Sequence, residues 1–127
     1  MTQIIEPRQG SLTAEQIDFY ETEGYLVLPQ LLTEEDMAPA REAMAHKVSM
    51  IADKLFADGL IQDKHETAPF EKRLALLFEG LSDTDFLGYG RSWRDRLPGY
   101  YHLMSNPKIL DAVESLIGPE LFANPVY

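Results

Sequence analysis

The sequence contains no cysteine, few basic side chains and no long hydrophobic run, and each absence excludes a class of protein. Without cysteine there is no disulfide, no thiolate zinc site and no thiol nucleophile, which suits a reducing compartment. The 11 basic residues against 21 acidic ones give a net charge of −10, which disfavours nucleic-acid and anionic-membrane partners. No apolar stretch reaches the roughly 18 residues of a membrane span, and "MTQIIEPRQG" lacks signal-peptide features. We therefore expect a soluble, cytoplasmic protein with neither nucleic acid nor membrane as partner.

Two segments carry the same helix-start pattern. In "LTAEQI", Thr13 can cap a first turn while the Gln16 side chain bonds back to the cap, and in "LTEEDM" the same positions are taken by Thr33 and Asp36. Acidic residues crowd both first turns, where the helix dipole favours them. We predict one helix over about residues 14–22, stopped by Gly24, and a longer one that begins after Thr33.

The longer predicted helix ends near Gly59 and has an apolar stripe at helical spacing. Pro39 should bend this helix or delay its regular part. A third helix is predicted after Pro69, and a fourth is capped by Asn106 and stopped at Gly118. The predicted stripe of the second helix consists of Met37, Ala40, Met44, Val48, Ile51 and Leu55, and the buried face of the fourth consists of Ile109, Val113, Leu116 and Ile117.

Two short segments have the composition of β-strands. Residues 25–28, "YLVL", lie between Gly24 and Pro29, and the chain closes on "LFANPVY". Residues 82–101 are irregular and are predicted to be a loop, with a single turn near residues 100–104. Two short strands alone make a marginal sheet. The chain is therefore either nearly all helical, or its strands belong to a sheet that other residues complete.

Two landmarks resemble a known family. "TAEQIDFYETEGYLVLPQLLTEEDMAPAREAM" resembles the opening of phytanoyl-CoA dioxygenase-like enzymes, and "NPKILDAVESLIGPELFANPVY" resembles their next landmark, a helix ending in Gly-Pro that leads into the catalytic barrel. The landmarks occur in the right order and cover roughly half the chain.

The resemblance implies an α+β fold: N-terminal helices and the first strands of a double-stranded β-helix (jelly-roll, cupin-like) oxygenase, with the barrel incomplete in this chain. Residues 1–127 would be the N-terminal part of a single oxygenase domain without an internal boundary. The family uses iron(II) and 2-oxoglutarate to hydroxylate a small molecule, and its iron is held by two histidines and one carboxylate. The implied partners are that substrate and the remainder of the barrel, in the same or a second chain.

None of the three histidines begins the His-x-Asp or His-x-Glu pair that the family uses. His46 is predicted to lie on a helix surface, His65 in a solvated loop, and His102 to be partly buried as a structural histidine. There is also no His-Glu-x-x-His run and no Gly-x-Ser-x-Gly nucleophile elbow. We expect no catalytic residue and no metal ligand in this chain, and neither iron nor 2-oxoglutarate binding by the chain alone. The family's pair would follow Tyr127, so we expect the front part of a longer enzyme.

Two residues are candidates for contact with 2-oxoglutarate, both through the resemblance. Arg91 lies nearest to the place where family members present a basic residue to the co-substrate, and Tyr127 falls on an early barrel strand. A different interpretation of "GYGRSWRDRLPGYY" is a surface loop whose arginines pair with nearby aspartates while its aromatic rings cover the core. For Tyr127 the alternative is ordinary core packing.

Three hypotheses remain open from the sequence. The first is the N-terminal segment of a phytanoyl-CoA dioxygenase-like oxygenase, inactive by itself. The second is a small acidic helical module for protein interaction, which resembles the family only in its helix caps. The third is one chain of a split oxygenase whose other chain carries the iron ligands. The substrate stays open, because family members oxidise acyl-CoA thioesters, compatible solutes, phosphonates and natural-product intermediates.

Overall fold

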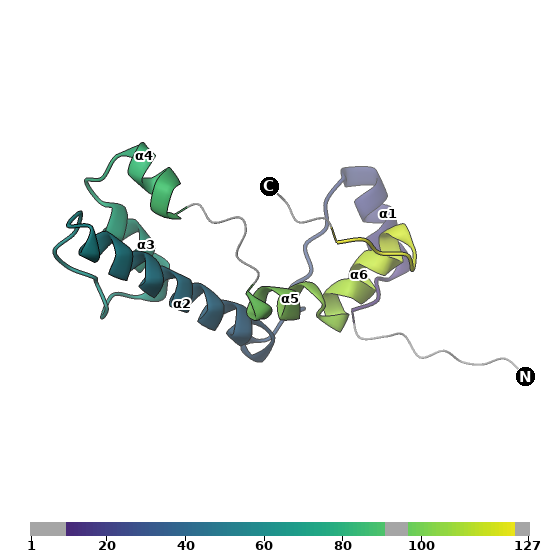
Figure 1. Cartoon of the computed structure of the whole chain (residues 1–127). Helices are drawn as coiled ribbons and strands as arrows, with labels where there is room; N and C mark the ends of the chain where they lie inside the picture. Colours follow the sequence, from purple (N-terminus) through teal and green to yellow (C-terminus); the bar gives the residue numbers. More distant parts are fainter. Residues whose placement is uncertain (1–9, 91–96, 124–127) are drawn as a thin grey trace, which may run out of the picture. The chain divides into compact units, whose positions relative to one another are not determined.

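The computed structural model describes residues 10–90 and 97–123, and these residues form helices and connecting segments (Figure 1). No β-strand occurs within these two ranges. None of the helices in them is long and apolar enough to cross a membrane. The elements are α1 (Ala14–Glu23), α2 (Glu34–Ala57), α3 (Phe70–Phe78), α4 (Asp83–Asp85), the π-helical turn η1 (Phe86–Gly90), α5 (Pro98–Met104) and α6 (Pro107–Ile117).

The expected α+β fold with the first strands of a double-stranded β-helix is therefore wrong for the described residues. Residues 25–28 have no regular secondary structure, and neither do residues 121–123 of the second proposed strand. A strand is defined by hydrogen bonds to a neighbouring strand, and an isolated one is not stable. "YLVL" has the apolar composition of a strand, but within the described ranges it has no strand with which to pair.

The segment 25–28 nevertheless shows the alternation of an extended chain. Tyr25 is 58% exposed and Val27 is 70% exposed, whereas Leu26 and Leu28 are half-buried. Successive side chains of an extended backbone point to opposite sides, so one side of this segment is covered and the other faces solvent. The prediction of a buried strand fails here in its burial as well as in its pairing.

The chain divides into two compact units. The first unit comprises residues 1–39 and 100–127, and the second comprises residues 40–99. The division falls inside α2, directly after Pro39. The helix begins at Glu34, so this proline does not delay it.

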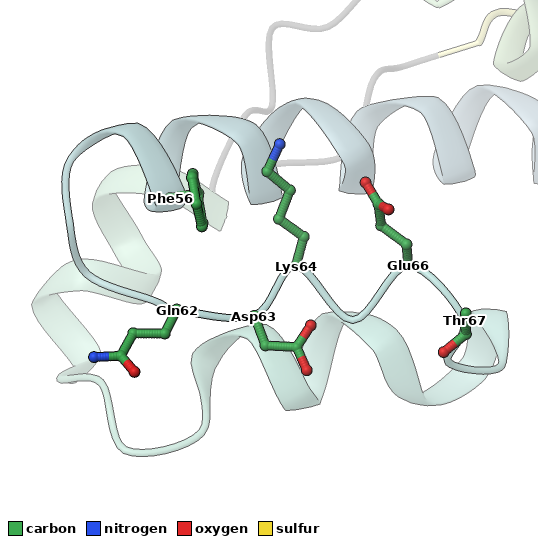
Figure 2. A pocket seen from close by; sticks show the side chains of 6 residues that line it. All are labelled: Phe56, Gln62, Asp63, Lys64, Glu66 and Thr67. Carbon is green, nitrogen blue, oxygen red and sulfur yellow. The ribbon is translucent and has the colours of Figure 1, made fainter.

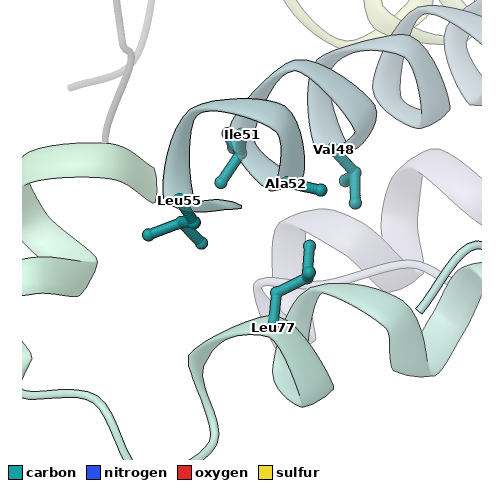
Figure 3. Packing of buried hydrophobic residues seen from close by; sticks show 5 residues of the cluster. All are labelled: Val48, Ile51, Ala52, Leu55 and Leu77. Carbon is teal, nitrogen blue, oxygen red and sulfur yellow. The ribbon is translucent and has the colours of Figure 1, made fainter. Parts of the chain in front are cut away.

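The second unit is built around the contact of α2 with α3. Leu55 and Leu77 are fully buried, and Figure 3 shows them with Val48, Ile51 and Ala52 in one cluster. Four of these five residues come from α2 at the spacing of one helix face, and Leu77 inserts from α3. The predicted stripe of α2 is confirmed at Val48, Ile51 and Leu55. It fails at Met44, which is 42% exposed.

Residues 82–90 are more regular than predicted. The Ser82 hydroxyl accepts a hydrogen bond from the Asp85 backbone N–H at 3.1 Å, and the Asp85 side chain accepts from the Ser82 N–H, which starts α4. In η1, the Tyr89 hydroxyl donates to Asp58 Oδ2 at 2.5 Å, and the Lys54 ammonium lies 5.1 Å from the Tyr89 ring centroid. The prediction of a loop is wrong for residues 83–90. The predicted turn near residues 100–104 corresponds to the end of α5.

The first unit contains the helices whose ends were predicted best. Thr13 and Gln16 form the capping box of α1, with hydrogen bonds of 2.9 and 3.2 Å, and Gly24 ends the helix at φ 80°. Asn106 caps α6, its side-chain oxygen accepting from the Lys108 N–H at 2.9 Å. These ends depend on residues within one turn, which is why sequence alone located them.

The inward face of α6 differs from the predicted one. Ala112 is buried, whereas Ile117 is 69% exposed and Val113 is 37% exposed. Ile109 and Leu116 are half-buried on the same face as Ala112, at spacings of three and four. The prediction ranked residues by apolarity, but the helix turns its small alanine toward the rest of the first unit.

Candidate functional site

Both residues proposed for contact with 2-oxoglutarate, Arg91 and Tyr127, lie outside the described residues. These two assignments therefore stay predictions. The structure does describe all three histidines. His46 is exposed on α2, as predicted. His65 is half-buried with its Nδ1 3.6 Å from Asp63 Oδ2, and His102 is exposed on α5, so its predicted partial burial is wrong.

No group of three or more His, Asp or Glu side chains in the described part of the chain lies close enough to hold a metal ion. The described residues do not fit the two-histidine, one-carboxylate site that the resemblance implies for iron(II). We therefore derive no chemical step through iron or 2-oxoglutarate from these residues.

An open hollow of about 400 Å³ lies in the second unit, where the loop after α2 turns back along the helix (Figure 2). Figure 2 shows Lys64 and Glu66 pointing toward α2. The Lys64 ammonium lies 2.9 Å from Asp53 Oδ1 and 5.0 Å from the Phe56 ring centroid. The hollow is lined by Phe56, Gln62, Asp63, Lys64, Glu66 and Thr67.

The Lys64 ammonium in this hollow is already paired with Asp53. The hydrogen bond from Lys64 lowers the pKa of Asp53, and the same contact raises the pKa of Lys64. Arg73 fixes the loop from the other side, because its Nη1 donates to Ser49 Oγ at 2.8 Å and its Nε and Nη2 both donate to the Lys64 carbonyl at 3.2 Å. This arrangement explains the shape of the loop.

A polar junction in the first unit joins the start of α2 to the start of α6. The Asp36 carboxylate forms an ion pair with Lys108 Nζ and accepts from Asn106 Nδ2 at 3.1 Å. It also accepts from the Thr33 backbone N–H at 2.8 Å, as the second predicted capping box requires. Lys108 is the main cause that holds the pKa of Asp36 well below its usual range, with the Thr33 N–H adding to it. One carboxylate thus serves a local cap and a contact between residues 72 positions apart.

Sequence reasoning assigned Asp36 and Asn106 only to helix capping. Nothing in the spacing of these residues indicates that the starts of α2 and α6 meet. The contact depends on how the chain between them folds back. The acidic Asp36 and the basic Lys108 were each visible in the sequence. Their pairing was not.

The most unusual feature of the first unit is the apolar surface that it leaves exposed. Ala112 is its only buried apolar residue in the described ranges. At the end of α6 and just beyond it, Ile117 is 69% exposed and Phe122 is 89% exposed. Contiguous exposed apolar patches mark surfaces that another protein segment covers, and we take these two strongly exposed side chains as the candidate for such a surface.

Comparisons of the chain with protein-family models, with curated proteins and with solved structures give no match.

Proposed function

We propose that this chain is a noncatalytic helical segment of an iron(II)- and 2-oxoglutarate-dependent oxygenase of the phytanoyl-CoA dioxygenase-like type. In this proposal the metal ligands belong to other residues, and the chain packs against the part that carries them. The whole enzyme would hydroxylate a small molecule in the cytoplasm. The sequence support is the pair of ordered landmarks, and the structural support is the uncovered apolar surface of the first unit.

The single observation that carries the proposal is the exposure of Ile117 and Phe122. Full burial of a large apolar side chain contributes about 1.5–3 kcal/mol. Scaled by exposures of 69% and 89%, covering both side chains would contribute about 3 kcal/mol. That free energy corresponds to about a hundredfold in affinity, which is enough to hold a segment against its partner surface.

The proposal no longer includes a barrel strand within the described residues. It requires only that α6 and the residues after it contact an apolar surface supplied by another part of the enzyme. The role of such a segment is to cover that surface and exclude water from it, which stabilises the catalytic part without contributing a reacting group.

The test is to express the affinity-tagged chain in its native host and to identify by mass spectrometry the polypeptide that copurifies with it. We expect a polypeptide with a His-x-Asp or His-x-Glu pair and a later histidine. The purified assembly should convert 2-oxoglutarate to succinate when iron(II) is added. The double substitution Ile117→Ser with Phe122→Ser should weaken the association about a hundredfold.

A matched control is available in the second unit. Met50 is 59% exposed and Leu87 is 52% exposed, and the double substitution Met50→Ser with Leu87→Ser should leave the association unchanged. Stoichiometric binding of iron(II) by residues 1–127 alone would contradict the proposal. A partner without metal-ligand residues would contradict it as well.

The second candidate is an acidic helical interaction module with no link to oxygenases. The observation that favours it is the helical structure of the described residues, which replaces the predicted strands. The same purification distinguishes the two candidates. The module predicts a partner that lacks the iron motif and an assembly that forms no succinate.

A further inference from the structure

Helix α1 has one outward face on which aromatic and acidic side chains alternate. Glu15, Phe19 and Glu23 are spaced by four residues, which places them in line on one face. Phe19 is 41% exposed and Tyr25 is 58% exposed, and their rings meet edge to face with centroids 5.4 Å apart. No residue of α1 is buried, so little of the helix is covered by the rest of the first unit.

Apart from Glu15 in the first turn, which the helix dipole favours, the charges on α1 work against the helix itself. Its four carboxylates, Glu15, Asp18, Glu21 and Glu23, include pairs three residues apart, where like charges repel. Glu21 and Glu23 stand near the carbonyl end, where the helix dipole disfavours negative charge, and the last turn has no basic residue. A local arrangement that opposes the fold, with no compensation from the described residues of its own unit, indicates a functional surface.

The rest of the described first unit is also rich in acidic side chains. The described residues of the first unit contain ten acidic side chains and a single basic one, Lys108. Lys108 is already paired with Asp36. No cation in the described part of this unit is therefore left to offset the carboxylates of α1.

We propose that the face formed by Glu15, Phe19, Glu23 and Tyr25 docks a basic amphipathic helix of a partner protein. An apolar side chain of that helix would contact the Phe19 and Tyr25 rings, and flanking Lys or Arg side chains would pair with Glu15 and Glu23. Cations also bind to exposed aromatic faces. A second copy of this chain does not fit, because two surfaces of the same charge repel.

The proposal goes beyond the oxygenase assignment, because it rests on residues other than Ile117 and Phe122. The probe is a fluorescein-labelled peptide about 15 residues long, with Leu at the positions of one helix face and Lys at all others. Two comparison peptides replace every Lys by Glu, or every Leu by Ser. Binding to the full chain is measured by fluorescence anisotropy at about 50 and about 300 mM NaCl. At the higher concentration the electrostatic screening length is reduced to roughly 6 Å.

We expect the Lys–Leu peptide to bind, the two comparison peptides to bind much more weakly, and the higher salt to weaken binding. Glu15→Gln with Glu23→Gln should lower the affinity about threefold to tenfold. Phe19→Ala should lower it about fivefold. All three substitutions are at exposed positions, and alanine favours helix more than phenylalanine does; circular dichroism verifies that the fold is kept.

The matched control is Glu42→Gln with Glu79→Gln, which removes the same charge from exposed positions of the second unit. The proposal predicts unchanged binding for this control. Equal weakening by both double variants would show attraction to net charge alone and would overturn the proposal, as would a lack of Lys–Leu peptide binding. Ile117→Ser with Phe122→Ser should not affect peptide binding, so failure here and failure of the oxygenase proposal are separate results.

Discussion

Leu77 is the residue whose truncation should damage the second unit most. It is fully buried, and it is the only residue of the five-membered cluster that comes from α3 (Figure 3). Leu77→Ala removes three carbon atoms, which represents about 2.4 kcal/mol of transfer free energy. The cavity that remains adds to this, and measured Leu→Ala changes in cores range from about 2.7 to 5 kcal/mol. We expect the free energy of unfolding to fall by about 3 kcal/mol, because α2 and α3 can approach each other only far enough to fill part of the cavity.

A loss of this size is large for a small unit. Domains of about 60–100 residues change their melting temperature by about 4–8 °C for each kcal/mol. The Leu77→Ala protein should therefore melt about 12–24 °C lower, as followed by far-ultraviolet circular dichroism. The control is Leu87→Ala, the same chemical change at a side chain that is 52% exposed, with an expected loss of about 1 kcal/mol or less. Equal shifts for the two variants would refute the assignment of the core.

Three further predictions concern the first unit. Because Lys108 holds the pKa of Asp36 below its usual range, Asp36 stabilises the fold above the unfolded-state pKa of about 3.9, and this contribution is lost as pH falls toward the folded-state pKa. Asp36→Asn should flatten the acid limb of a melting-temperature profile between about pH 2 and pH 7, and an unchanged limb would contradict this. Gly10→Ala should destabilise more than Gly24→Ala in urea titrations, because both glycines have positive φ but only at Gly10 would a Cβ lie 2.4 Å from the Lys108 carbonyl oxygen. Asn106→Ala should cost about 1–3 kcal/mol in the same titration through loss of the α6 cap and the Asp36 contact, and a cost near zero would show that the cap is dispensable.

The sequence predicted well the features that depend on one helical turn. The caps at Thr13, Thr33 and Asn106 and the stop at Gly24 involve donors and acceptors within four residues, so their chemistry is complete in the sequence. The start of α4 at Ser82 follows the same rule, but the surrounding glycine and aromatic residues favoured the prediction of a loop. Its capping pattern with Asp85 could have been found.

The exposure of apolar residues was predicted less well. Val113 and Ile117 were predicted to face the core because they are apolar and suitably spaced. In the structure, α6 turns Ala112 toward the rest of the first unit instead. A periodic pattern identifies a helix and its apolar side, and the choice among neighbouring positions on that side depends on which other helix approaches. The candidate docking faces at Phe19 and at Ile117 became visible only when exposure was known.

The sequence by itself determined where most of the helices begin and end, the acidic character of the chain and the apolar stripe through Val48, Ile51 and Leu55. These properties come from local hydrogen bonding, formal charge and helical spacing. The tertiary structure decided that residues 25–28 have no partner strand among the described residues, that Asp36 meets Lys108, and that Phe19, Ile117 and Phe122 face outward. Each of these depends on which distant segments come together, and the free energy of such contacts is not encoded in any single stretch of the chain.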